Sequence, residues 1–187
     1  MKVTLESHEF RKDLFFHELV SSFSISLCGC PAIFEKDIDI YKRPNQVLSF
    51  SGGYSASKHL TPYQLRQTAL RGDITKSKHI AVCCMMLANT AYESVKHYND
   101  GSETFEFFRH VRNASSHLNV FQFNQKEPAN PASWRGANID HHLKGDQNKL
   151  FGHECFGYFL GVADILELLL DIEKLIIRNN PELRESE

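Results

Sequence analysis

An apolar stripe between residues 74 and 98 is the feature that most restricts the fold. Side chains that are apolar or small recur there at steps of three and four residues, which places them on one face of an α-helix. The stripe consists of Ile80, Cys84, Leu87, Ala91, Val95 and Tyr98. No run of strands alternates with helices elsewhere in the chain, so the sequence predicts an all-α bundle and disfavours a parallel sheet.

Capping residues predict the starts of two further helices. Thr61 before Pro62 is typical of an N-cap that is followed by proline at the first helical position. Ser102 follows the break at Asn99-Asp100-Gly101 and is expected to cap a helix that reaches about residue 118. Residues 9–27 also carry apolar side chains at roughly helical spacing, so we expect an N-terminal helix there.

The C-terminal half combines a long connection with a long helix. Residues 119–138 contain two prolines and a glycine, and apolar and polar residues alternate at their start, so we expect a loop with a short extended segment. Residues 147–178 are rich in apolar residues and are predicted to form the last and longest helix. A bend is expected near Gly157 or Gly161, because a straight helix of this length is long for a small domain.

Composition is that of an ordinary globular protein, with 187 residues, 42% hydrophobic and 24% charged. We therefore expect a single domain over residues 1–187, with the bundle core at about 74–178. The longest apolar run, residues 81–88, is too short to span a membrane, and the N-terminus does not have the pattern of a secretory signal. The five cysteines are odd in number and lie mostly in apolar stretches, which indicates reduced, structural thiols and a cytoplasmic location.

Charge is unevenly distributed along the chain. The net charge of −2 argues against a generic nucleic-acid binder. Residues 58–79 nevertheless contain five basic residues and one acidic residue, whereas residues 154–187 contain eight acidic and three basic residues. The basic section is either a surface that faces phosphates or a solvated helix face.

Arg112 and His117 form the candidate catalytic pair. An arginine can hold a phosphate with its planar fork of N–H donors, and a histidine can transfer a proton near neutral pH, so the two together could cleave RNA without a metal. The four intervening residues are small and polar, and the pair lies near a predicted helix end. Spacing alone does not select this pair, because similar spacings also occur at Arg11–His17 and at Arg135–His141 and Arg135–His142.

Helical geometry sets a condition on this pair. Five residues on an ideal helix rotate by about 500°, which leaves the two side chains about 140° apart. They converge better if the helix loosens at its end, or if a second subunit supplies the missing group in a two-fold homodimer. The structural alternative is a surface ion pair for Arg112 and capping of the helix C-terminus by His117.

A second group of titratable residues raises the question of a metal. His141 and His142 follow Asp140, but adjacent histidines on a loop rarely converge on one ion. The chain also lacks a glutamate at the His-Glu-x-x-His spacing that would supply a base. We therefore predict neither a metal site nor a cofactor.

The segment Phe108-Arg-His-Val-Arg112-Asn113-Ala-Ser-Ser-His117 resembles the Arg-polar-x-x-x-His motif of the HEPN superfamily. Proteins of that superfamily are helical bundles, and many are metal-independent ribonucleases. The resemblance covers roughly residues 74–178. It continues through Phe121-x-Phe123, Pro131-Ala-Ser-Trp134-Arg135-Gly136 and the closing apolar segment, much as in a branch linked to toxin, antiphage and RNA-processing systems.

The resemblance implies a function as an endoribonuclease that uses the 2′-hydroxyl of its own RNA substrate. His117 would transfer protons, Arg112 would stabilise the phosphorane, and Asn113 would orient the phosphate or the histidine. Substrate contacts are expected from Ser116, Trp134 and Arg135. Asn119 stands where nucleotidylated members have tyrosine, so that regulation is not expected. A homodimer and a neighbouring antitoxin or regulator are the expected partners. The alternative is a non-catalytic HEPN-like module that binds nucleotides or proteins.

Overall fold

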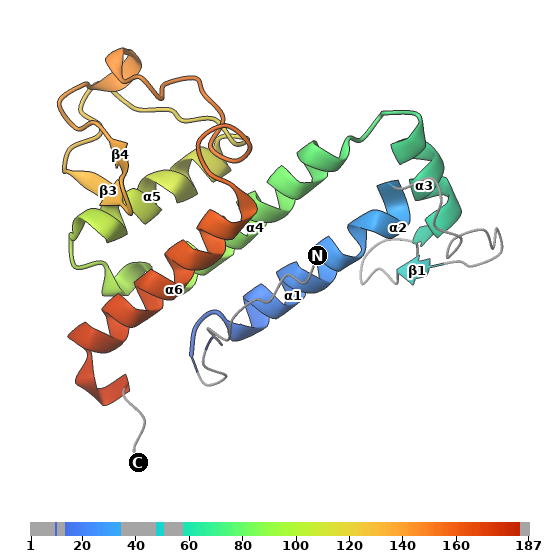
Figure 1. Ribbon diagram of the computed structural model, residues 1–187, viewed down its shortest axis with the longest axis horizontal. Helices are drawn as coiled ribbons and strands as arrows, with labels where there is room; N and C mark the ends of the chain where they lie inside the picture. Colours follow the sequence, from blue (N-terminus) through green and yellow to red (C-terminus); the bar gives the residue numbers. More distant parts are fainter. Residues whose placement is uncertain (1–9, 11–13, 35–47, 51–57, 184–187) are drawn as a thin grey trace. The chain divides into compact units, whose positions relative to one another are not determined.

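The computed structural model describes residue 10 and residues 14–34, 48–50 and 58–183. The chain divides into two compact units, one formed by Met1–Phe23 with Ala81–Glu187 and the other by Ser24–Ile80. Two helices, α1 (His17–Cys28) and α4 (Lys76–Val95), each contain a boundary between the units. Within the described residues the structure is mainly helical, with two short antiparallel ladders (Figure 1).

The smaller unit consists of short elements. It contains α2 (Cys30–Phe34), β1 (Leu48–Phe50), β2 (Lys58–Leu60) and α3 (Pro62–Leu70), and α2 packs against α3. The strands β1 and β2 pair in antiparallel register.

Helix α3 begins where its capping residues predict. Thr61 Oγ1 accepts a hydrogen bond from the Gln64 N–H at 3.1 Å, and the Gln64 side chain accepts one from the Thr61 N–H at 3.3 Å. The two bonds form a capping box, which satisfies N–H groups that the helix leaves free at its start.

Three helices dominate the larger unit. They are α4, α5 (Glu103–Ser116) and α6 (Val162–Asn179), with the 3₁₀ turns η2 (Lys96–Tyr98) and η4 (Pro181–Leu183) at the ends of α4 and α6. The predictions for residues 74–98 and 102–118 are confirmed. Ser102 caps α5 through a hydrogen bond from the Phe105 N–H. The α4 stripe is buried in the larger unit at Cys84, Leu87, Ala91 and Val95.

The prediction of one helix over residues 147–178 is wrong in its first half, because α6 begins only at Val162. The preceding residues form the 3₁₀ turn η3 (Gly145–Gln147) and a series of turns. Gly152 and Gly157 adopt positive φ angles of 79° and 99°, which a right-handed helix excludes. Gly161 is the N-cap of α6, where the Asp164 carboxylate accepts its N–H at 2.7 Å.

The N-terminal helix is also shorter than predicted. Helix α1 starts at His17, and residues 14–16 form a bend. Phe16 is fully buried there, with its ring against Phe10, and Phe15 packs on Tyr98. The apolar spacing in this segment therefore reflects aromatic packing as well as a helix. Residues 9 and 11–13, which the prediction also covers, lie outside the described residues.

A small hairpin follows the motif helix, but it lies at residues 132–139. Residues 121–123, where the alternation of apolar and polar residues predicted the extended segment, form no strand. Strand β3 (Ala132–Trp134) pairs with β4 (Ala137–Ile139), and β3 packs on α5. The turn between them is Arg135-Gly136, with φ angles of 44° and 88°. Two central residues with positive φ are typical of a tight hairpin turn. At Val120 the backbone forms a single bridge with Glu154.

Helix α5 is the centre of the larger unit and is buried on several sides. Tyr92 of α4 packs edge-on against Phe105 and Phe108. On another side, Phe107 packs against Trp134 and Phe159. Each fully buried phenylalanine stabilises the fold by about 1.5–3 kcal/mol. None of the described helices is long and apolar enough to cross a membrane.

Candidate functional site

The end of α5 carries the predicted catalytic pair. His117 is the C-cap residue, with φ −101° and ψ 41°, and its backbone N–H donates to the carbonyls of Asn113 and Ala114 at 3.1 Å. The regular helix therefore ends at His117, and a loosened helix end was one of the two alternatives that would let the pair converge. Leu118 and Asn119 then adopt φ angles of 57° and 71°, which turn the chain away from the helix.

Asn119 fixes the segment that follows His117. Its side-chain amide donates to the Phe156 carbonyl at 2.9 Å and accepts from the Phe156 N–H at 2.7 Å. Its own carbonyl accepts from the Cys155 N–H at 2.7 Å. Asparagine is among the few residues that tolerate a left-handed conformation, and its amide matches a backbone peptide group. This pairing was missed by the sequence analysis, which considered Asn119 only as a replacement for tyrosine.

Arg112 is anchored to α4 by Glu93. Its Nη2 donates to Glu93 Oε1 at 2.6 Å, its Nη1 donates to Asn113 Oδ1 at 3.3 Å, and its guanidinium lies 5.8 Å from the centre of the Tyr92 ring. Hydrogen bonds from Lys96 and from Arg112 lower the pKa of Glu93, so the carboxylate stays ionised. The Arg112 Nε is buried and has no hydrogen-bond partner among the described residues.

A second contact beside Arg112 joins the same two helices. Ser116 Oγ and Asn89 Oδ1 lie 2.8 Å apart. Arg112 and Ser116 are four residues apart on α5, and Asn89 and Glu93 are four residues apart on α4. Residues at this spacing share one helix face. The two contacts therefore form adjacent rungs between α4 and α5, and they fix the direction in which Arg112 points.

The His117 side chain is exposed. Among the described residues it has no hydrogen-bond, ion-pair or ring partner, in contrast to Arg112 and Ser116. A solvent-accessible imidazole can exchange a proton with a bound ligand without first breaking an internal contact. The structure thus combines an anchored cation and an exposed proton carrier at one end of α5.

A buried polar network lies on another side of α5 and was also missed by the sequence analysis. Arg109 forms ion pairs at 3.0 Å with Glu106 and with Glu127. Its Nη2 lies 3.2 Å from His110 Nε2. Burial, together with the charge of Arg109, lowers the pKa of His110 to about 4, so this histidine is neutral near pH 7. Its ring packs against Phe123, which indicates a structural role.

Trp134 and Arg135, predicted to contact substrate, are both tied to Asp171 of α6. The Trp134 indole N–H donates to Asp171 Oδ2 at 2.9 Å, and Arg135 Nε donates to the same oxygen at 2.8 Å. Arg135 also pairs with Glu167 at 2.9 Å. Burial raises the pKa of Asp171, but the hydrogen bonds from Arg135 and Trp134 outweigh it and lower that pKa overall.

The location of these two residues differs from that of the catalytic pair. The Trp134 ring is only 6% exposed and packs on Phe107, in the first half of α5, whereas Arg112 and His117 lie in its second half and at its end. Contact of Trp134 and Arg135 with substrate stays a prediction.

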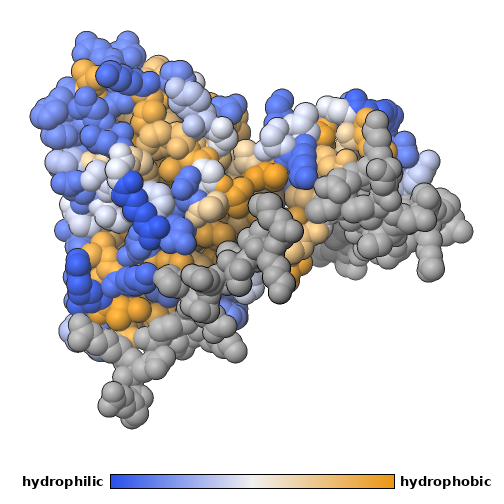
Figure 2. All heavy atoms as spheres, viewed as in Figure 1, coloured by the Kyte–Doolittle hydropathy of each residue, from blue (hydrophilic) through white to orange (hydrophobic). Residues whose placement is uncertain are grey.

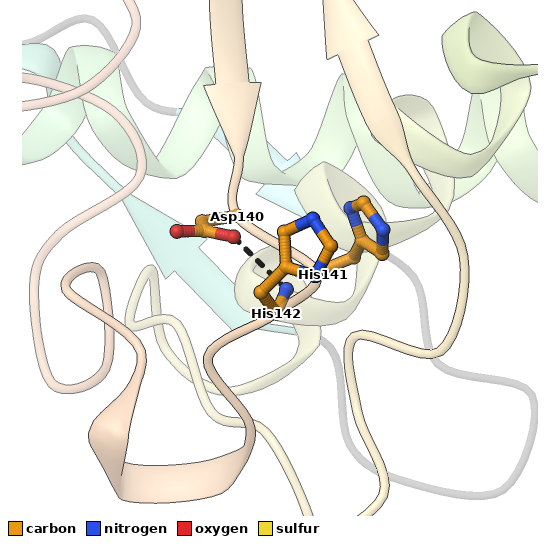
Figure 3. Close-up of side chains that lie close together, drawn as sticks. All are labelled: Asp140, His141 and His142. Atoms are coloured by element: carbon orange, nitrogen blue, oxygen red, sulfur yellow. Dashed lines mark hydrogen bonds between the residues drawn. The ribbon is translucent and has the colours of Figure 1, made fainter.

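Asp140, His141 and His142 lie close together, which the sequence analysis did not expect (Figure 3). One ligand atom from each residue lies within 4.8 Å of the others, and the two imidazole centres are 4.0 Å apart. Ligands of a tetrahedral zinc ion lie about 3.4 Å apart, given bonds of about 2.0–2.1 Å. Asp140 already accepts the His142 backbone N–H at 2.9 Å. The three side chains are therefore close enough to be considered as metal ligands, although the sequence predicted no metal site.

None of the five cysteines, all of which lie in the described residues, forms a disulfide bond. Burial raises the pKa of Cys84 to about 12 and also raises the pKa of Cys155. A thiol with a raised pKa is a poor nucleophile near pH 7, so these two cysteines are structural.

Comparison with protein-family models, with curated proteins and with solved structures finds no match to this chain.

Proposed function

We propose that this protein is a metal-independent endoribonuclease of the HEPN type, which cleaves RNA by attack of the 2′-hydroxyl on the adjacent phosphate. The observation that carries the proposal is the exposed His117 imidazole, which has no partner in the described part of the chain. It lies at the end of the helix in which Glu93 holds Arg112. A histidine can transfer the protons of a metal-free phosphoryl transfer, and an arginine can bind the phosphate.

In the proposed reaction, one His117 imidazole accepts the proton of the 2′-hydroxyl. The 2′-oxygen forms a bond to phosphorus, and the bond from phosphorus to the 5′-oxygen breaks. A protonated imidazole gives a proton to that 5′-oxygen, so the products carry a 2′,3′-cyclic phosphate and a 5′-hydroxyl. Arg112 stabilises the extra negative charge with the N–H groups of Nη1 and Nη2 that Glu93 and Asn113 do not use. Asn113 orients Arg112 through its side-chain oxygen.

A two-fold homodimer would supply the second imidazole. Val82, Met86, Asn89 and Glu93 recur on α4 at steps of four, three and four residues, so they share one helix face. Val82 and Met86 are exposed on this face, and Leu118, next to His117, is 83% exposed. Exposed apolar side chains beside the Arg112–Glu93 contact favour a partner surface at this place. Two copies joined there would bring both Arg112–His117 pairs to one RNA strand.

Cleavage of purified RNA in EDTA tests the proposal. We expect wild-type cleavage to survive chelation, and we expect His117→Ala and Arg112→Ala each to reduce the rate at least about 100-fold. His142→Ala, which removes an exposed histidine elsewhere, should cleave at the wild-type rate. Far-UV circular dichroism checks that each variant is folded. Loss of wild-type cleavage on chelation, or full activity of His117→Ala, would refute the mechanism.

A non-catalytic HEPN-like binding module is the second candidate, and the two rungs between α4 and α5 favour it. In that case Arg112 and Ser116 serve to join the helices. Wild-type protein that binds RNA, a nucleotide or a protein but leaves RNA intact would support this candidate.

A toxin or defence role, with a neighbouring antitoxin or regulator, is part of the first candidate. It is tested by expressing wild-type protein and His117→Ala in bacteria. Growth arrest by the wild type alone would support the role.

A further inference from the structure

A pocket of about 360 Å³ lies in the larger unit, away from the Arg112–His117 pair. The first turn of α5, the end of β3 with its turn, and the last turns of α6 surround it. Its lining consists of Thr104, Trp134, Arg135, Asp171, Lys174, Leu175 and Arg178. Three of these residues are basic and one is acidic, although the C-terminal part of the chain is acidic overall. In Figure 2, hydrophilic and hydrophobic side chains lie side by side over the C-terminal part of α6.

The acidic residue of the pocket is already satisfied. Asp171 accepts hydrogen bonds from Trp134 and, through both oxygens, from Arg135. The Arg135 guanidinium, which Glu167 also binds at 2.9 Å, offsets the charge of Asp171 in part and forms a fixed wall of the pocket. A carboxylate that is engaged in this way repels an incoming anion less than a free one would.

The other two basic residues remain available. Lys174 is 59% exposed, and its Nζ is 4.0 Å from Asp171 Oδ1, which is the outer limit of an ion pair. Arg178 has no hydrogen-bond or ion-pair partner among the described residues and is exposed. The two are four residues apart and therefore share one face of α6, so both cationic groups can reach one anion.

We propose that this pocket binds the phosphoryl group of a nucleotide-sized ligand. The arginine fork of Arg178 and the ammonium group of Lys174 match phosphate oxygens, and the Thr104 hydroxyl can donate a further hydrogen bond. Trp134 and Leu175 provide apolar surface for the rest of the ligand. The volume lies in the range of small-molecule sites, at about 300–1,000 Å³.

Cations near a helix C-terminus also stabilise the helix dipole, which by itself would account for Lys174 and Arg178. Thr104 and Trp134, however, come from other elements and close the pocket around the same two cations.

The phosphoryl group has two sources, namely a phosphodiester of an RNA strand or the phosphate monoester of a free nucleotide. The inference does not depend on RNA cleavage, because Thr104 lies eight residues and about 12 Å along α5 from Arg112.

Binding should be measured in the His117→Ala background, so that cleavage cannot affect the result. The probes are adenosine 5′-monophosphate, adenosine and a six-nucleotide RNA with a 5′-hydroxyl. Isothermal titration calorimetry measures the affinity for each probe. The test variant adds Lys174→Ala and Arg178→Ala. Its charge-matched control adds Lys126→Ala and Lys149→Ala, which remove two exposed lysines elsewhere.

We expect the pocket variant to bind the monophosphate or the RNA at least tenfold more weakly, and the control to change affinity less than twofold. Tighter binding of the monophosphate than of adenosine identifies a monoester site. Binding of RNA that the pocket variant loses and the control keeps, without binding of the monophosphate, identifies a phosphodiester site. If neither probe binds, or if both double variants weaken binding equally, the proposal is wrong. Neither result bears on the cleavage proposal, which is judged from the rate of the wild type.

Discussion

Replacement of Asn119 by alanine should be among the most destabilising single changes near the candidate site. The substitution removes both hydrogen bonds to Phe156 and leaves a buried N–H and a buried carbonyl unpaired. Each unpaired buried group costs about 1–3 kcal/mol. Alanine in a left-handed conformation costs a further 1–2 kcal/mol or so. Because the turn can relax and admit water, we expect a loss of about 3–5 kcal/mol in the free energy of unfolding.

Urea denaturation followed by far-UV circular dichroism measures this loss, provided that the m-value stays constant. Asn119→Gly is the matched control, since glycine loses the same hydrogen bonds but accepts a positive φ. The glycine variant should therefore be more stable than the alanine variant by about 1 kcal/mol. Asn119→Asp keeps the acceptor for the Phe156 N–H and loses the donor. A loss below about 1 kcal/mol for Asn119→Ala would refute the view that these two bonds hold the turn after His117.

Two further predictions concern pH and assembly. The folded-state pKa of His110 is about 4, below its ordinary value of 6.5. Between these two pH values the unfolded chain binds more protons than the folded protein. The free energy of unfolding therefore falls as the pH drops from about 6.5 to about 4. A pKa shift of this size corresponds to roughly 3 kcal/mol in the free energy of unfolding. His110→Phe should remove this contribution to the pH dependence of stability, as measured by urea titrations at several pH values. An unchanged pH profile would contradict a buried, neutral His110. Met86 lies on the exposed face of α4, so Met86→Glu should shift the protein from dimer to monomer, as measured by analytical ultracentrifugation, and should reduce RNA cleavage. Lys149→Glu should change neither the oligomeric state nor the cleavage rate. A wild-type protein that sediments only as a monomer would contradict the dimer.

Local signals predicted much of the helical framework. The α4 stripe and the caps at Thr61 and Ser102 depend on residues a few positions apart, and all three predictions are confirmed. The helix predicted over residues 147–178 failed because its first half is held by pairing with a distant segment. Val120 bridges Glu154, and the Asn119 amide binds Phe156, so contacts between residues more than 30 positions apart replace helical hydrogen bonds there.

At the candidate site, too, features that depend on nearby residues were predicted and contacts between distant residues were not. The sequence predicted that Arg112 and His117 lie near a helix end, because the motif and the chain reversal are local. It did not predict Glu93 as the partner of Arg112, since that contact depends on the packing register of two helices. The hydrogen bond from Trp134 to Asp171 joins residues that are 37 positions apart, so neither periodicity nor motif spacing could predict it. Nor did the sequence suggest that Lys174 would share a pocket with Thr104.

Helix α5 links the two features proposed here, with the pocket at its first turn and the Arg112–His117 pair at its end. Eight of its residues are buried: Phe105, Glu106, Phe107, Phe108, His110, Val111, Ala114 and Ser115. An inserted residue would rotate everything after it by about 100° and would separate Arg112 and Ser116 from their partners on α4. The spacing between the two features is therefore set by the number of residues in one rigid helix. Among divergent relatives, insertions and deletions should collect in the exposed turn around Gln125, while the length of α5 stays constant.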